Sequence, residues 1–196
     1  MTRRRILAVV QLGTGLMLTG AALALYLRYL QYTYELTFLS NFCTGVFLIA
    51  AGVRGVKGRS VPQLPYLCFT VLLFLVMATS LAFSGNFSFS GPALFLHLIN
   101  PLAVIACFFF ASDMRQVPRK LVPAAVLMPA AYLLFALIFG AVTGNHIYFF
   151  LDYGQVGIAY TVIFVLAAGA ALLLVSWLLW RVNRLLKGAG ASKGKE

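Results

Sequence analysis

The chain has 196 residues, of which 62% are hydrophobic and only 10% are charged, and its formal net charge is +11. A soluble domain usually has about a quarter charged residues, so this composition excludes an ordinary soluble protein. The apolar residues come in blocks of roughly 20, the length that crosses a bilayer. Because the basic residues lie between and beyond these blocks, they predict membrane topology rather than binding to nucleic acid.

Six apolar blocks predict an all-α, polytopic membrane protein, built as a bundle of six transmembrane helices. A basic start at 1–5 precedes a single transmembrane domain at 6–180, and a basic tail follows at 181–196. The predicted spans are 6–27, 36–53, 64–83, 92–111, 121–142 and 156–180. A basic start before an apolar block can be a signal peptide, but the length of the first block and the five that follow favour a retained helix.

The basic residues also predict the orientation of the bundle. If the amino terminus is cytoplasmic, 14 of the 15 Lys and Arg fall in cytoplasmic segments, and Arg28 alone falls outside. Such a bias predicts that both termini are cytoplasmic. The expected location is therefore an integral multi-pass position in a membrane, which is the bacterial cytoplasmic membrane if the source is prokaryotic. Arg28 and Glu35 are then predicted to be interfacial charges.

The second block begins with a stripe of polar residues. Thr37, Ser40, Asn41 and Thr44 follow one another at i, i+3, i+4 and i+7, so a helix places all four on one face. In lipid such a face must turn toward the protein interior or a wet cavity. We therefore expect the other helices to pack around this stripe.

The fourth block contains His97 and, one turn later, Asn100. A histidine within a membrane span either has a chemical task, such as that of a general base, or bonds to a neighbouring helix, and both readings stay open. Pro101 follows His97 by four residues and removes the helical partner of the His97 carbonyl, which predicts a kink. With the predicted orientation, His97 and Thr37 both lie in the outer half of the bundle.

A cavity in that outer half would collect these polar groups. We expect it to be walled by the second, third and fourth spans and roofed by residues 143–154. Asn41 is more often an interhelical anchor than a catalytic donor, and Asp152 more often caps a loop than completes a site. A threonine acts as a nucleophile only beside a base.

Neither a metal nor a cofactor is predicted. The chain has only two histidines, and neither has a cysteine or a second histidine at helical spacing. The three cysteines lie within apolar blocks and are predicted to be free packing residues; they are Cys43, Cys68 and Cys107.

Three blocks together resemble a known family. They are Leu36-Thr37-Phe38, His97 shortly before Pro101, and the Thr-Gly…Tyr148-x-Phe-Leu-Asp152 segment before the last span. This combination resembles the androgen-induced protein and androgen-dependent TFPI-regulating protein family, with its bacterial six-span relatives. The chain departs from the family in the predicted roof, where Phe149 replaces a proline and a pair, Asn145-His146, replaces an aromatic residue.

The resemblance implies an intramembrane threonine hydrolase that cleaves fatty acid esters of hydroxy fatty acids. Carried over residue by residue, it implies that Thr37 is the nucleophile and His97 the base. The resemblance does not identify the oxyanion donor, for which Asn41 and Asn100 are candidates, and Asp152 could either orient the histidine or cap a loop. The candidate supporting residues are Ser40, Asn41, Asn100, Tyr148 and Asp152. The expected partners are membrane lipids and an amphipathic lipid ester, without nucleic acid.

Two other classes of function remain open at this stage. A small transporter would show related halves, but the fifth span has prolines and no polar stripe to match the second. A non-catalytic scaffold would use small residues such as Gly13 and Gly20 for helix packing, but it leaves the grouping of His97 with Thr37 unexplained.

Overall fold

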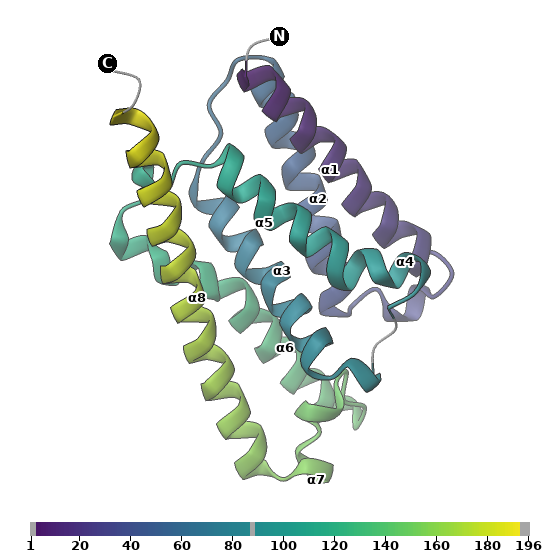
Figure 1. Ribbon diagram of the computed structural model, residues 1–196. Coiled ribbons are helices and arrows are strands. Elements are labelled where there is room, and N and C mark those ends of the chain that lie inside the picture. Colours follow the sequence, from purple (N-terminus) through teal and green to yellow (C-terminus); the bar gives the residue numbers. More distant parts are fainter. Residues whose placement is uncertain (1–2, 87–88, 193–196) are drawn as a thin grey trace.

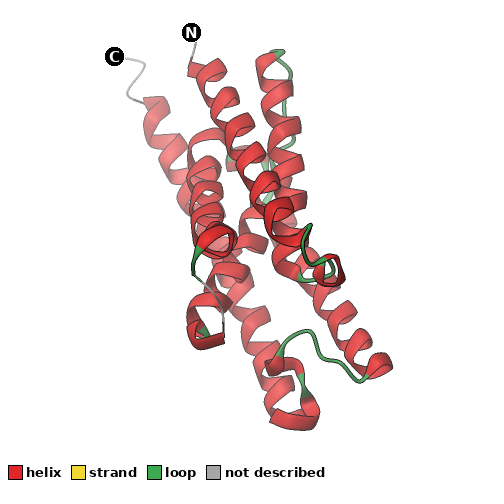
Figure 2. Cartoon of the chain, turned by 90° about the vertical axis from the view of Figure 1, so that its right-hand side faces the viewer, coloured by secondary structure: helices red, strands yellow, loops and turns green. Residues whose placement is uncertain are grey.

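The computed structural model describes residues 3–86 and 89–192, and this part of the chain is helical without any strand (Figure 2). Six of its helices are long and apolar enough to cross a membrane, which confirms that part of the prediction. These six candidate spans are Arg4–Tyr26, Leu36–Val56, Leu64–Ala82, Gly91–Ala111, Arg119–Thr143 and Ile158–Ala189. The amino- and carboxyl-terminal helices approach the same end of the bundle (Figure 1).

The α-helices of the structure are α1 (Arg3–Tyr26), α2 (Leu36–Val56), α3 (Leu64–Ala82), α4 (Gly91–Leu94), α5 (Asn100–Ala111), α6 (Leu127–Thr143), α7 (Tyr153–Val156) and α8 (Ile158–Ser192). Tighter 3₁₀ segments connect them, namely η1 (Leu30–Tyr32), η2 (Ser84–Asn86), η4 (Met114–Gln116), η5 (Arg119–Val126) and η6 (Phe149–Leu151). One π-helical segment, η3 (Phe95–Ile99), joins α4 to α5.

Helix α3 lies at the centre of the bundle (Figure 1). It packs against α2 and α5 on one side and against α6, η5 and α8 on the other. The largest group of buried apolar side chains surrounds it and includes Leu67, Val71, Leu73 and Phe108. This division gives two groups of helices with α3 between them.

Helices α1 and α2 form a closely packed hairpin because glycines let their backbones approach. A Cβ added at Gly15 would lie 2.7 Å from the Gly45 carbonyl oxygen, and one at Gly52 would lie 2.7 Å from the Ala8 carbonyl oxygen. The sequence had suggested Gly13 and Gly20 as packing positions, but a Cβ at either would meet nothing within 4 Å. The contact face is therefore set by Gly15 of α1 and Gly52 of α2, each of which faces the other helix.

Pro101 had predicted a kink in the fourth span, and the structure has a π-helical turn, Phe95–Ile99, at this place. The Asn100 amide donates to the Phe95 carbonyl, five residues earlier. Proline has no N–H, so the regular bond to the His97 carbonyl cannot form, and the helix widens over the preceding turn. Turns of this kind place their residues off the regular helical register, and His97 lies within this one.

The fifth and sixth spans differ from their predicted bounds. The fifth begins at Arg119 with the 3₁₀ segment η5, which contains Pro123, a residue that cannot donate a helical hydrogen bond. Helix α8 continues past the predicted end at 180 to Ser192. Asn183, which is fully buried, holds this extension: it accepts from the Met114 amide at 3.0 Å and donates to the Phe108 carbonyl at 3.2 Å.

Candidate active site

Two cavities meet at the amino-terminal end of α2. The first, which we call the polar chamber, has a volume of about 580 Å³. Its polar lining consists of Tyr26, Glu35, Thr37, Ser90, His97 and Tyr148. The second, which we call the apolar slot, has a volume of about 220 Å³ and lies between α3, α6 and α8. Thr37 and Tyr148 line both cavities, so they mark the junction.

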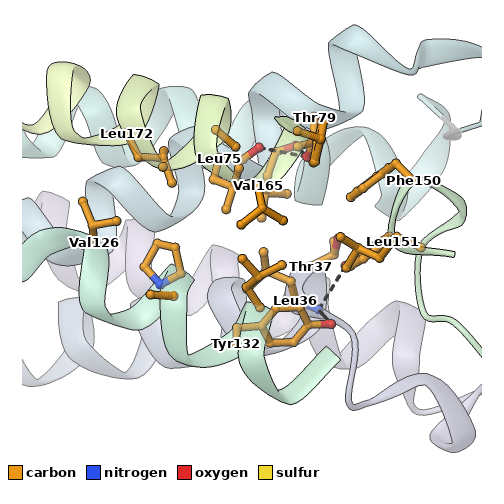
Figure 3. Close-up of a pocket in the computed structure, with 18 of the residues that line it drawn as sticks. Leu36, Thr37, Leu75, Thr79, Val126, Tyr132, Phe150, Leu151, Val165 and Leu172 are labelled. Carbon is orange, nitrogen blue, oxygen red and sulfur yellow. Dashed lines mark hydrogen bonds between the residues drawn. The ribbon is translucent and has the colours of Figure 1, made fainter. Parts of the chain in front are cut away.

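The apolar slot runs along the helices from the roof toward the middle of the bundle. Figure 3 shows Phe150 and Leu151 at one end and Val126 toward the other. Helices α6 and α8 both pack against α3 but have few contacts with each other, which leaves the space between them. Ala130 lines the slot and is also exposed, so the slot reaches the surface that would face lipid.

Thr37 lies in the first turn of α2 and is almost fully buried, with 4% of its surface exposed. Its hydroxyl makes no hydrogen bond to any residue in the described part of the chain. The backbone amides of Thr37 and Phe38 also have no partner there, as expected for the first turn of a helix. The first turn of α2 therefore places the unpartnered Thr37 hydroxyl beside two unpartnered backbone N–H donors. The partial positive charge of the helix N-terminus lies at the same place.

His97 lines the polar chamber with Thr37 and is 8% exposed. Its ring packs edge to face against that of Phe89, with an interplanar angle of 73° and 6.1 Å between the ring centroids. No direct hydrogen bond joins the His97 and Thr37 side chains, both of which lie in the described part of the chain. The chamber therefore has both residues in its lining, without a hydrogen bond between them.

Asn41 ties Thr37 to the π-helical turn. Its Nδ2 donates to the Thr37 carbonyl at 2.8 Å and to the Leu96 carbonyl at 3.2 Å. The Leu96 carbonyl is available because the Asn100 amide has turned to Phe95. The Oδ1 of Asn41 accepts from the Asn100 Nδ2 at 2.8 Å.

This pattern makes Asn41 an anchor between α2 and the fourth span. Both of its amide hydrogens are already donated, so Asn41 can bind an oxyanion only by breaking one of these bonds. Asn100 is fully buried, and its Oδ1 has no partner among the described residues. Ser40 adds a weaker brace, because its Oγ donates to the Thr37 carbonyl at 3.3 Å.

Asp152 lines neither cavity and instead caps α7. Its Oδ1 accepts from the amides of Gly154 and Gln155 at 3.1 and 3.2 Å. The same oxygen lies 3.5 Å from the Nδ1 of His146, which packs against Gly140. The Asp152 carboxylate thus lies beside His146 rather than beside His97. Of the two roles considered for Asp152, capping a loop and orienting the catalytic histidine, the structure shows capping.

Tyr148 reaches from the roof to the first turn of α2. The Leu36 amide donates to the Tyr132 hydroxyl at 2.9 Å and to the Tyr148 hydroxyl at 3.2 Å. Burial raises the pKa of Tyr148 well above its usual range, so its phenol stays protonated near neutral pH. Tyr148 therefore links the segment before the last span directly to the residue that precedes Thr37.

Sequence reasoning missed Glu35, which it treated as an interfacial charge. The structure places it in the lining of the polar chamber, where its carboxylate accepts a hydrogen bond of 2.6 Å from the Tyr26 hydroxyl. Burial raises the pKa of Glu35, and the bond from Tyr26 opposes that shift. The available signal was its position two residues before Thr37, at the start of the polar stripe.

Comparison with protein-family models, curated proteins and solved structures found no match.

Proposed function

We propose that the protein is an intramembrane hydrolase of lipid esters, with Thr37 as the nucleophile and His97 as the base. One observation carries this proposal: the unpartnered hydroxyl of Thr37 stands where a polar chamber containing His97 meets an apolar slot. An amphipathic ester has the same two parts. With its acyl chain in the slot, its carbonyl would lie at the junction, next to Thr37.

The proposed reaction is acyl transfer through threonine. His97 accepts the Thr37 hydroxyl proton as the oxygen attacks the ester carbonyl, and the tetrahedral intermediate then expels the alcohol, which takes that proton from His97. A water molecule next gives a proton to His97 and attacks the acyl-threonine. The acid leaves, the proton returns to the Thr37 oxygen, and the enzyme is restored. The proton transfers between Thr37 and His97 require either an approach of the two side chains or one bridging water.

The oxyanion in this proposal is stabilised by the amides of Thr37 and Phe38. Both amides lack partners in the described structure, whereas both donors of Asn41 are in use. A backbone donor at the nucleophile itself is a common solution in acyl transfer, and each such donor contributes about 3 kcal/mol to the stability of the transition state.

The family resemblance supports the same proposal. The three blocks that carry it are far apart in the chain, yet Thr37, His97 and Tyr148 line one chamber. Fatty acid esters of hydroxy fatty acids are the substrates that the resemblance implies. The direct test is to incubate the purified protein with such esters and with uncharged long-chain esters, and to measure release of the fatty acid; no release above background from either class would contradict the proposal.

We further propose that the bundle is inserted in the membrane with both termini in the cytoplasm, because 14 of the 15 basic residues then lie inside. A single cysteine introduced at Gly85 should react with an impermeant thiol reagent added outside intact cells. A cysteine introduced at Gly58 should react only after the cells are opened. Reversed labelling of the two positions would invert the topology.

The apolar slot provides a separate test of where the acyl chain binds. Gly169 lines the slot, and a Cβ built there meets nothing within 4 Å, so Gly169→Leu should fold and fill the slot. Excluding about four methylenes costs about 3 kcal/mol, which predicts a loss of about 100-fold in kcat/KM for long-chain esters. Short-chain esters should be cleaved as before.

Gly188→Leu is the matched control for this prediction. Gly188 lies on the same helix and also has open space around its Cβ, but it does not line the slot. This variant should cleave long and short esters at the wild-type rates. An equal loss on both chain lengths in Gly169→Leu would mean that the acyl chain lies elsewhere.

A further inference from the structure

The lining of the polar chamber has an unusual charge balance. Glu35 contributes a carboxylate, and no Lys or Arg is among the described residues that line it. Arg28 is in the same connection between α1 and α2, but it is exposed and does not line the chamber. His97 is the remaining titratable base in the lining, and as a general base it must be neutral. Among its described lining residues, the chamber therefore has no permanently cationic side chain that could pair with a carboxylate.

The carboxylate of Glu35 is held in place within the chamber. It is half-buried, it accepts the 2.6 Å bond from Tyr26, and it directly precedes the first turn of α2. Burial raises the pKa of Glu35, whereas the hydrogen bond from Tyr26 and the positive end of the helix oppose that shift, so the carboxylate is ionised in mildly alkaline buffer. Because the chamber is partly closed from water, this charge acts on a bound molecule more strongly than a surface charge would.

This position matters for the part of a substrate that does not enter the slot. If the acyl chain fills the slot and the ester lies at Thr37, the alcohol part of the ester must occupy the chamber beside Glu35. A free carboxylate on that part would meet a like charge without a compensating cation. An uncharged polar group, such as a hydroxyl or an amide, could instead donate a hydrogen bond to Glu35.

We propose that Glu35 is a specificity-determining residue that selects lipid esters whose polar end carries no negative charge. This inference rests on the proposed ester hydrolysis and narrows its substrate class. It departs from the substrates that the family resemblance implies, because those carry a free carboxylate.

The experiment compares two matched lipids. One is a fatty acid ester of a hydroxy fatty acid, and the other is the same molecule with its free carboxylate replaced by a primary carboxamide. In mildly alkaline buffer, the wild-type protein should cleave the carboxamide with a kcat/KM at least about ten-fold higher. Glu35→Gln keeps an acceptor for the Tyr26 hydroxyl and removes the charge, so it should bring the two values close together.

Asp113→Asn is the control, because it also removes one negative charge. Asp113 lies in the connection after α5, where it pairs with Arg115, and it does not line the chamber. This variant should keep the wild-type ratio. Equal cleavage of the two lipids by the wild type, a preference for the carboxylate, or an unchanged ratio in Glu35→Gln would overturn the inference.

A binding measurement separates this inference from the proposed hydrolysis. If neither lipid is cleaved, the hydrolase proposal fails, and binding of the two lipids to the wild type and Glu35→Gln is then compared by native mass spectrometry. Tighter binding of the carboxamide by the wild type alone supports the role of Glu35. Equal binding of both lipids overturns it.

Discussion

Thr37→Ala should reduce ester hydrolysis by about 10⁴-fold or more, because it removes the oxygen that attacks the carbonyl. Thr37→Ser should keep measurable activity, since it keeps a nucleophilic hydroxyl. The Thr37 hydroxyl has no hydrogen bond to the described residues, so its loss should leave thermal unfolding of the purified protein nearly unchanged. Hydrolysis is measured as fatty acid release, and covalent reaction as labelling by a fluorophosphonate probe followed by mass spectrometry.

Thr79→Ala provides the matched control for the loss of the Thr37 hydroxyl. Thr79 also lines the slot, but its Oγ1 donates back to the Leu75 carbonyl at 2.9 Å, and no side chain that could act as a base is among the described residues that line the slot. This variant should retain hydrolysis and labelling. Unchanged hydrolysis in Thr37→Ala, or attachment of the probe to another residue, would contradict the covalent mechanism at Thr37.

The polar stripe of α2 could be predicted from the sequence because its cause is local. Thr37, Ser40, Asn41 and Thr44 are all buried, as the helical spacing and the cost of polar groups in lipid required. Six spans followed from the same logic of length and apolar composition. The irregularity before Pro101 was also local, since it follows from one missing N–H.

A cavity beneath residues 143–154 was expected from the sequence, but the apolar slot and the place of Glu35 in the chamber could not be predicted in the same way. The slot exists because α6 and α8 have few contacts with each other, and that depends on how both pack against α3 rather than on any pattern within either helix. Glu35 lines the chamber because the turn η1 brings the end of α1 and the start of α2 together, so that Tyr26 can donate to it. These contacts depend on how separate segments pack against one another, and the sequence of one segment alone does not specify that packing.

In the roof, the residues around Asp152 determine which of its two predicted roles it has. Asp152 had two readings, as a cap and as a partner of the catalytic histidine. The short helix α7 follows it at once and supplies the two amides that it accepts from. The nearest histidine is His146, which approaches Asp152 because it lies in the same connection before α8.

His97→Gln should lower hydrolysis by a factor close to that of Thr37→Ala, because a threonine hydroxyl is a weak nucleophile without a base. In the wild type, hydrolysis should fall as the medium is acidified, since a protonated imidazole cannot accept the threonine proton. The residual activity of His97→Gln should lack this acid limb. The double variant Thr37→Ala/His97→Gln should be no slower than the single variants, because the two residues act as a unit.

The second histidine of the chain makes this prediction decisive. His146 is mostly buried and lies 3.5 Å from a carboxylate, as a histidine base often does, but it does not line either cavity. His146→Gln should therefore keep both the rate and its dependence on pH. Thermal unfolding of both variants separates loss of chemistry from loss of fold, since His97 lies in the π-helical turn that Asn41 anchors. Wild-type hydrolysis in His97→Gln together with loss of it in His146→Gln would move the base to the roof and overturn the assignment of the chamber.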